Sequence, residues 1–428
     1  MNLAFSEEQI MIRDSAAEVL AERSASAAVR HAIEHNSGRD DALWRTVARE
    51  LGWCALTVPE AAGGAGLGAM ELVLLMEQMG RRLACVPYFG TVCLAATALA
   101  RCESAAARAW LSRIASGEVS ATLALDAAGG FDGRRASAYA VPGFDARTVT
   151  VYAEETAHGY RLSGTLAQVV DGASADLLLV PALIANEAQT TGLFELTQAD
   201  RVGLTRTPLV TLDATRPLTR IELNAVDVPR DAMMVCGSEV QRALSDTAWF
   251  AALALAAEQL GGAQQCLDLT LTYTAERVQF GRAIASFQAV KHRCAQMMVE
   301  IEAAQSAVLG AAQAWDRAHS EQRDQAGVSL APDVLADIAT AKATANDAFR
   351  FCAQEAIQLH GGVGFTWEYD PQLYFKRAQA CSAQFGTTAQ MLSLIAEQVI
   401  DRSEVSGAAL PLPPAHTDHA QAVLAGVL

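Results

Sequence analysis

The chain has 428 residues, of which 51% are hydrophobic and 19% charged, and its formal net charge is −16. This acidic balance excludes broad attraction to nucleic acid or to anionic lipid, because both need clustered cations. The chain is longer than one hydrophobic core usually serves, so we expect more than one domain. The apolar composition favours burial of hydrophobic surface between subunits, so we expect an oligomer. The nine cysteines have no CxxC pair or metal-like spacing, and we expect reduced thiols, no metal site and a cytoplasmic protein.

Helical patterns dominate the first part of the chain, residues 1–119. Ser6 precedes acidic residues and apolar positions at three- and four-residue spacing, which predicts a capped amphipathic helix and not a signal peptide. Pro59 and the Gly63-Gly64 pair interrupt the pattern before the next helix, AMELVLLMEQMGRRL. No apolar run is long enough for membrane insertion. We therefore predict an N-terminal helical domain.

The pattern changes twice along the rest of the chain. Residues 120–232 carry short β-branched and apolar runs separated by turn residues, which predict a central antiparallel β-domain. Helical periodicity fills residues 233–405 and predicts a C-terminal four-helix bundle, with a break near Gly327 and Pro332. Residues 406–428 contain three prolines and predict a flexible tail. The predicted fold class is α+β, with helices on both sides of the β-domain in sequence.

Polar donors gather around a turn in the segment TYTAERVQFGRAIASFQAVKHRCAQM, residues 272–297. Arg277, Gln279, Gln288 and Lys291 flank the turn at Gly281. Guanidinium and amide donors at a chain reversal suit a pyrophosphate, whose oxygens accept charge-assisted hydrogen bonds. The alternative is a helix–turn–helix corner with solvated charges.

A glycine-rich stretch follows a predicted helix in EAIQLHGGVGFTWEYDPQLYFKRA, residues 355–378. Gly361, Gly362 and Gly364 would let the backbone approach a ligand closely and expose its amides to an anion. A plain helix C-cap is the alternative. The stretch does not follow a strand, so it is not a Rossmann fingerprint.

Together these two segments resemble motifs of the acyl-CoA dehydrogenase family, and the FSEEQ helix and the LGW and VPEAAGGAGLG segments fall in the family's order. The resemblance implies an FAD-dependent oxidoreductase that dehydrogenates an acyl-CoA thioester at the α and β carbons. It further implies an electron-transfer flavoprotein as acceptor and FAD at a subunit interface. FGTTAQ, at 385–390, resembles the family's YEGTAQ. The implied FAD contacts are Arg277, Gln279, Phe280, Gln288, Gln358, Gly361, Gly362, Thr388 and Gln390.

The family's catalytic glutamate is missing at both places where the resemblance would put it. The YEG position is Gly386, and the alternative position on the first helix of the C-terminal domain is Ala251. Neither side chain can accept a proton. Two nearby acids remain as candidates. Glu258, if buried with a raised pKa, could be a general base or else a structural hydrogen-bonding group, and Asp246 fits a first-turn acid facing the helix dipole.

The β-domain also departs from the family, because LALDAAGGFDGRRAS replaces its TEPGAGSD-type loop. By resemblance, Val169 or Val170 would neighbour the flavin ring. Small residues such as Ala251 and Gly386 leave room for a bulky acyl group.

Three functional hypotheses follow. The chain is a complete acyl-CoA dehydrogenase that uses another carboxylate as base. Or it is a base-less subunit of a mixed complex with a related chain, resembling steroid side-chain dehydrogenases. The third hypothesis is a flavin-dependent monooxygenase or a non-thioester binder on the same fold.

Overall fold

The computed structural model describes residues 5–125, 149–185, 190–197, 202–321 and 330–397. The predicted tail, residues 406–428, and most of the segment LALDAAGGFDGRRAS lie outside these ranges. Within them, no helix is both long enough and apolar enough to cross a membrane.

The N-terminal part is helical, as predicted. Ser6 caps the first helix, since its hydroxyl accepts from the Gln9 amide at 3.1 Å. Pro59 and Gly63 flank a single 3₁₀ turn, and the next long helix begins at Ala69. The helices longer than three residues are α1 (Glu7–Arg23), α2 (Ser26–His35), α3 (Asp41–Arg45), η1 (Thr46–Glu50), α4 (Ala69–Arg81), η4 (Phe89–Ala96), α5 (Thr97–Ala100) and α6 (Ala105–Ala115).

The central sheet is mixed, which corrects the purely antiparallel expectation. Its order is β6-β7-β3-β2-β4-β5-β8, and β1 and β2 both run parallel to β4. β3 pairs with one edge of β2, and β4 pairs with the other edge. Because the chain reverses once between β2 and β3 and again before β4, β4 runs in the same direction as β2. The strands are β1 (Ala121–Leu123), β2 (Val151–Thr156), β3 (Gly159–Val170), β4 (Leu177–Ile184), β5 (Thr191–Thr197), β6 (Leu204–Pro208), β7 (Leu218–Pro229) and β8 (Met233–Cys236).

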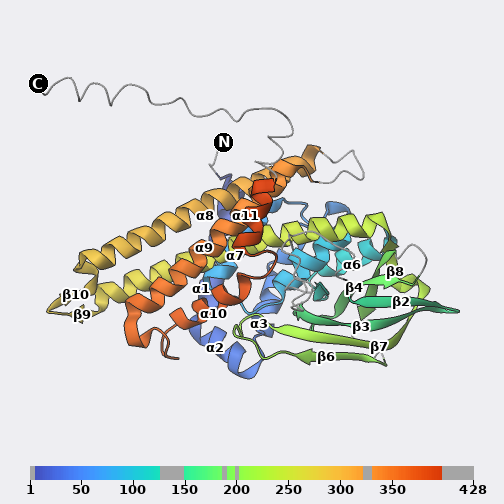
Figure 1. Ribbon diagram of the computed structural model, residues 1–428, viewed down its shortest axis with the longest axis horizontal. Helices are drawn as coiled ribbons and strands as arrows, with labels where there is room; N and C mark the ends of the chain where they lie inside the picture. Colours follow the sequence, from blue (N-terminus) through green and yellow to red (C-terminus); the bar gives the residue numbers. More distant parts are fainter. Residues whose placement is uncertain (1–4, 126–148, 186–189, 198–201, 322–329, 398–428) are drawn as a thin grey trace, which may run out of the picture.

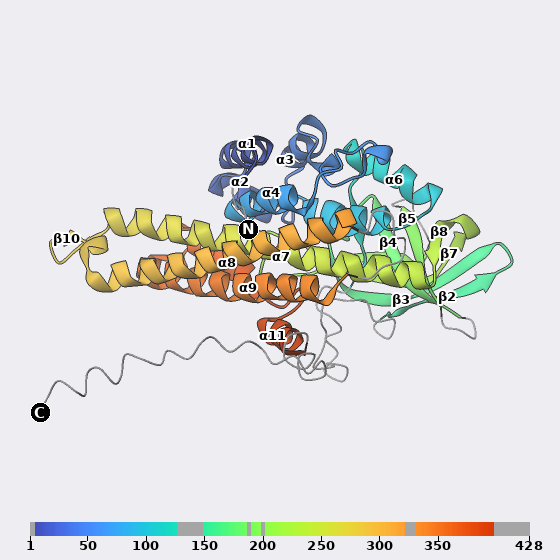
Figure 2. The same ribbon diagram turned by 90° about the horizontal axis from the view of Figure 1, so that it is seen from above.

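The described C-terminal part contains three long helices that lie side by side (Figures 1 and 2), together with two shorter α-helices. Figure 2 shows the N-terminal helices on one side of this layer, α11 on the other and the sheet beyond one end. The predicted α+β class, with helices before and after a central sheet, is confirmed. The elements are α7 (Ser238–Glu276), β9 (Val278–Gln279), β10 (Arg282–Ala283), α8 (Gln288–Glu321), α9 (Pro332–His360), η8 (Gly361–Val363), α10 (Pro371–Cys381) and α11 (Thr388–Ala396).

Two glycines allow α4 and α7 to touch backbone to backbone. A Cβ atom on Gly261 would lie 1.8 Å from the Glu77 carbonyl oxygen, and one on Gly80 would lie 1.9 Å from the Glu258 carbonyl oxygen. We expect Gly261→Ala to lower the free energy of unfolding by about 1–3 kcal/mol, because the helices must separate. Urea unfolding of the purified variant measures this change.

Gly310 in α8 is the matched control, since a Cβ there meets no described atom within 4 Å. Gly310→Ala should raise the free energy of unfolding by about 0.5–1 kcal/mol, because alanine has less backbone entropy to lose in a helix. Equal effects of the two substitutions would contradict the close helix crossing.

Candidate functional site

The segment 272–297 forms the end of α7, a two-stranded hairpin and the start of α8. Arg277 follows the last residue of α7 and is exposed, and its carbonyl accepts from the Ile284 amide at 2.8 Å across the hairpin. Phe280 and Gly281 form the tip, with φ of 53° and 77°, and the Phe280 side chain is 91% exposed. The hairpin therefore presents a guanidinium and an aromatic ring outward. The other two predicted residues, Gln279 and Gln288, are also exposed there.

The glycine-rich stretch lies at the same end of the long helices. The ring of His360, the last residue of α9, stacks on Tyr273 of α7 with centroids 4.3 Å apart. Gly361 and Gly362 follow directly, and a Cβ on either would meet no described atom within 4 Å. Gln358 is exposed in the last turn of α9. Two of the three predicted cofactor segments are thus brought together within one chain (Figure 1).

The third segment lies elsewhere. Thr388 starts α11, and its hydroxyl donates to the Asp347 carboxylate at 2.9 Å. The Gln390 side chain accepts from the Thr387 amide at 2.8 Å and so helps to cap α11. Asp347 precedes His360 by roughly 20 Å along the axis of α9, at 1.5 Å per residue. Within one chain, Thr388 and Gln390 therefore do not join the hairpin and the glycines.

Both family base positions are buried and carry no proton acceptor. Ala251 is fully buried within α7. Gly386 has a φ of +109°, and a Cβ there would lie 2.1 Å from Cε of Met391. The Gly386 carbonyl accepts from Nδ2 of Asn346 at 3.2 Å, which fixes the loop. The backbone at residue 386 thus disfavours any side chain, a carboxylate included.

Glu258 belongs to a buried ion cluster. Its two carboxylate oxygens accept from Arg216 and Arg377, and Nε of Arg377 also donates to Asp213 at 2.5 Å. Burial raises the pKa of Glu258, but Arg216 and Arg377 together outweigh it and hold the pKa below its ordinary value. The raised pKa on which a role for Glu258 as general base depended is therefore not found. A carboxylate held ionised by two guanidinium groups is a poor general base, and these contacts favour the structural alternative.

Asp246 is oriented away from the missing-base position. It precedes Ala251 by five residues, which places it roughly 140° around the helix. It lies 3.9 Å from Nε of Arg101, and burial raises its pKa despite that partner. Because α7 begins at Ser238, Asp246 is not in the first turn, and the helix-dipole expectation is wrong.

A further buried carboxylate, Asp171, follows Val169 and Val170, which are buried at the end of β3. Burial raises the pKa of Asp171 to about 6, although Arg216 and Arg39 lower it. No motif around Asp171 predicts a raised pKa, because the groups that surround its carboxyl come from η4 and from the segment before β7.

Asp171→Asn should change the pH dependence of stability. The folded pKa lies above the unfolded value, so the contribution of Asp171 is full below pH 4 and is lost as the pH rises through 6. At neutral pH, ionisation of the buried Asp171 lowers the free energy of unfolding of the wild type by at most about 3 kcal/mol. The asparagine variant should not show this loss. Denaturant unfolding between pH 4 and 7 measures it. Asp231→Asn, at an exposed site, should follow the wild-type curve, and a shared slope for all three proteins would contradict the assignment.

Comparison with known proteins decides the family. Residues 6–118 match the acyl-CoA dehydrogenase N-terminal domain, and residues 242–400 match the acyl-CoA dehydrogenase C-terminal domain. The acyl-CoA dehydrogenase IpdE2 of Mycobacterium tuberculosis is 32% identical over 393 residues, which cover 92% of this chain and 98% of that protein. The chain belongs to the acyl-CoA dehydrogenase family. The predicted resemblance and the enzyme class, an FAD-linked oxidoreductase family, are thereby confirmed.

Similar solved structures of the acyl-CoA dehydrogenase family include complexes of two different chains. The ChsE4–ChsE5 complex of Mycobacterium tuberculosis has a chain 27% identical to this one, with a TM-score of 0.77 and coverage of 96% of this chain and 100% of that chain. A variant of the Tcur3481–Tcur3483 steroid ACAD is 28% identical, with a TM-score of 0.74 and coverage of 93% and 99%.

Proposed function

We propose that this chain is the base-less subunit of a heteromeric acyl-CoA dehydrogenase, in which a related chain supplies the catalytic carboxylate. The backbone at Gly386 carries the proposal, because its φ of +109° strains any residue with a side chain, the family's glutamate included, and Met391 would also have to move. Ala251 is fully buried, and Glu258 is held by two arginines. The α-proton of an acyl thioester therefore has no acceptor among these residues of this chain.

The exposed end of the long helices fits part of an FAD. Arg277 offers a guanidinium fork to a pyrophosphate, and the open backbone at Gly361 and Gly362 offers amides. The exposed ring of Phe280 provides an apolar face beside them. When bound, FAD accepts the hydride. Thr388 lies far from this end of the same chain, which favours a cofactor shared between two chains.

The partner and substrate classes follow from the relatives. Two similar structures are complexes of two different chains, and one of them is a steroid ACAD. We infer that this chain likewise pairs with a related chain and that the pair acts on a bulky acyl-CoA. We infer from the family resemblance that an electron-transfer flavoprotein receives the electrons.

An anaerobic absorption experiment tests the proposal. The chain is purified alone and with a related chain that carries the family's glutamate, and acyl-CoAs of increasing bulk are added. We expect the flavin band to bleach only when both chains are present. Bleaching by the chain alone would establish a complete dehydrogenase. Flavin turnover that needs oxygen and a reductase, but no thioester, would establish the monooxygenase alternative.

Arg277→Gln tests the cofactor contact. Loss of a charge-assisted hydrogen bond of about 1.5–3 kcal/mol should weaken FAD binding by roughly 10- to 150-fold. Flavin fluorescence titration of the purified assembly measures the dissociation constant. Arg282→Gln, in the same hairpin with its guanidinium over Phe287, is the matched control and should bind FAD as the wild type does. Equal losses in both variants would point to general positive charge instead of a pyrophosphate contact.

A further inference from the structure

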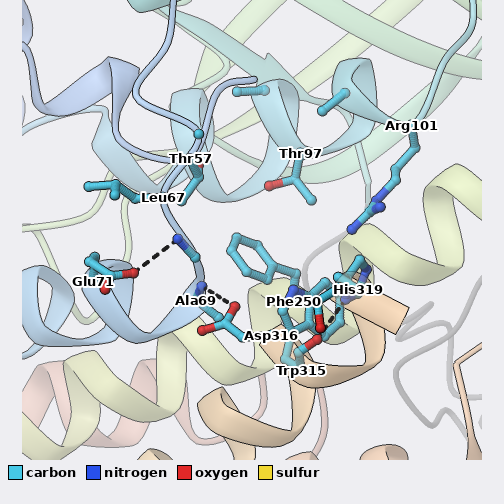
Figure 3. A pocket seen from close by; sticks show the side chains of 15 residues that line it. Thr57, Leu67, Ala69, Glu71, Thr97, Arg101, Phe250, Trp315, Asp316 and His319 are labelled. Atoms are coloured by element: carbon cyan, nitrogen blue, oxygen red, sulfur yellow. Dashed lines mark hydrogen bonds between the residues drawn. The ribbon is translucent and has the colours of Figure 1, made fainter. Parts of the chain in front are cut away.

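A cavity of about 390 Å³ lies between the loop before α4, α5, α7 and α8, within the size range of small-molecule sites (Figure 3). Leu67, Phe250 and Trp315 line it. The rings of Phe250 and Trp315 are tilted against each other, with centroids 5.0 Å apart. Phe250 directly precedes Ala251, so its side chain leaves α7 roughly 100° away from the missing-base position. The cavity therefore opens on a different side of α7.

Arg101 brings an unused donor to this cavity. Its Nε is buried and has no hydrogen-bond partner among the described residues. The nearest carboxylate oxygen, on Asp246, is 3.9 Å away, which is beyond hydrogen-bond range. The guanidinium carbon lies 5.9 Å from the centroid of the Trp315 ring. A buried donor without a partner favours a ligand that can accept from it.

His319 brings an acceptor. Its Nδ1 lies 2.8 Å from the Trp315 carbonyl oxygen, which can only accept, so Nδ1 holds the proton. Burial and the neighbouring Arg101 lower the pKa of His319 to about 4, so the ring is neutral at physiological pH. In this tautomer Nε2 carries a lone pair. Figure 3 places His319 beside Arg101 at the same wall.

The two acidic residues that line the cavity already accept hydrogen bonds from backbone amides of the protein. Asp316 accepts from the amides of Ala69 and Met70 at 2.6 and 3.0 Å, and Glu71 accepts from the Gly68 amide at 2.9 Å. These contacts cap the start of α4. Because Asp246 already faces Arg101, the remaining charge around the cavity is negative, and an anionic ligand is disfavoured.

We propose that this cavity binds an uncharged alcohol with an apolar body of one or two rings. The hydroxyl oxygen accepts from Arg101, and the hydroxyl proton is donated to Nε2 of His319. An alcohol is both donor and acceptor at one atom, which matches this pair, whereas a carboxylate only accepts. The rings lie against Phe250 and Trp315.

Isothermal titration calorimetry of the full chain tests the proposal with three probes of one shape: 2-naphthol, naphthalene and 2-naphthoate. We expect 2-naphthol to bind at least about tenfold more tightly than the other two, since 2-naphthoate lacks the donor and naphthalene lacks both the donor and the acceptor. Tighter binding of 2-naphthoate would overturn the uncharged-ligand assignment. If none of the three probes binds at any concentration up to its solubility limit, the site itself is overturned.

Variants assign the binding to this cavity. Arg101→Gln and His319→Phe should each weaken 2-naphthol binding by about tenfold. Arg113→Gln is the matched control, because Arg113 also lies over a tryptophan, Trp110, and pairs with an acid outside the cavity. Unchanged binding in both cavity variants would overturn the proposal.

A cavity-filling substitution guards against misfolding of those variants. Ala100 lines the cavity but is exposed, so Ala100→Leu should fill the space and leave the unfolding midpoint unchanged. It should abolish 2-naphthol binding, and retained binding would place the ligand elsewhere.

Discussion

Arg377→Met should lower the free energy of unfolding by about 3–5 kcal/mol. Arg377 is buried between Asp213 and Glu258. Its removal leaves Glu258 with Arg216 as its remaining arginine partner and leaves Asp213 with contacts to Thr215. Breaking a buried ion cluster on one side costs more than the cluster contributes, because the remaining charges stay desolvated. Urea unfolding followed by circular dichroism measures the change.

Two comparisons isolate the cause of this loss. Arg220→Met breaks an ion pair with Glu222 whose side chains are 50% and 35% exposed, so its effect should stay below about 1 kcal/mol. The double variant Arg377→Met/Glu258→Gln should recover part of the loss, because it also removes a buried charge. If the double variant were as unstable as the sum of its single substitutions, charge would not be the cause.

The fold class could be predicted from sequence because periodicity carries it. The 34 residues of α8 repeat apolar positions over many turns, and Ser6 caps its helix through residues three apart. Strand direction could not be predicted in the same way. The parallel pairing of Ala121 with Leu177 joins segments that lie far apart in sequence, and alternation within each run does not name its partner.

In the candidate site, too, local motifs could be predicted from the sequence, whereas contacts between distant residues could not. Arg277 and the glycines at 361 and 362 belong to local motifs, and the structure places both motifs at one end of the helices. The environment of Glu258 was missed because its partners lie 42 and 119 positions away. Burial alone, which α7 does predict, would have raised its pKa. Only the tertiary arrangement brings the two arginines that reverse the direction.

Gly386→Glu restores the family's residue type and is nevertheless expected to fail as a gain of function. A residue with a Cβ at a φ of +109° is strained, by about 1–3 kcal/mol, and the contact with Met391 adds about 1–3 kcal/mol of overpacking. The variant should therefore lose about 2–6 kcal/mol of unfolding free energy. Thermal and urea unfolding measure this loss, and Gly310→Glu, at the open position in α8, should change stability by less than about 1 kcal/mol.

The same variant separates two reasons for the missing base. If the backbone is the barrier, the chain with Gly386→Glu should bind FAD through Arg277 as before but still not bleach it when an acyl-CoA is added without the partner chain. Flavin binding serves as the control that the variant is folded. Bleaching by Gly386→Glu alone would mean that the loop can relax around Met391 and that one side chain separates this chain from a complete dehydrogenase. Continued dependence on the partner would mean that the loop held by Asn346 is built for a subunit that leaves proton abstraction to another chain.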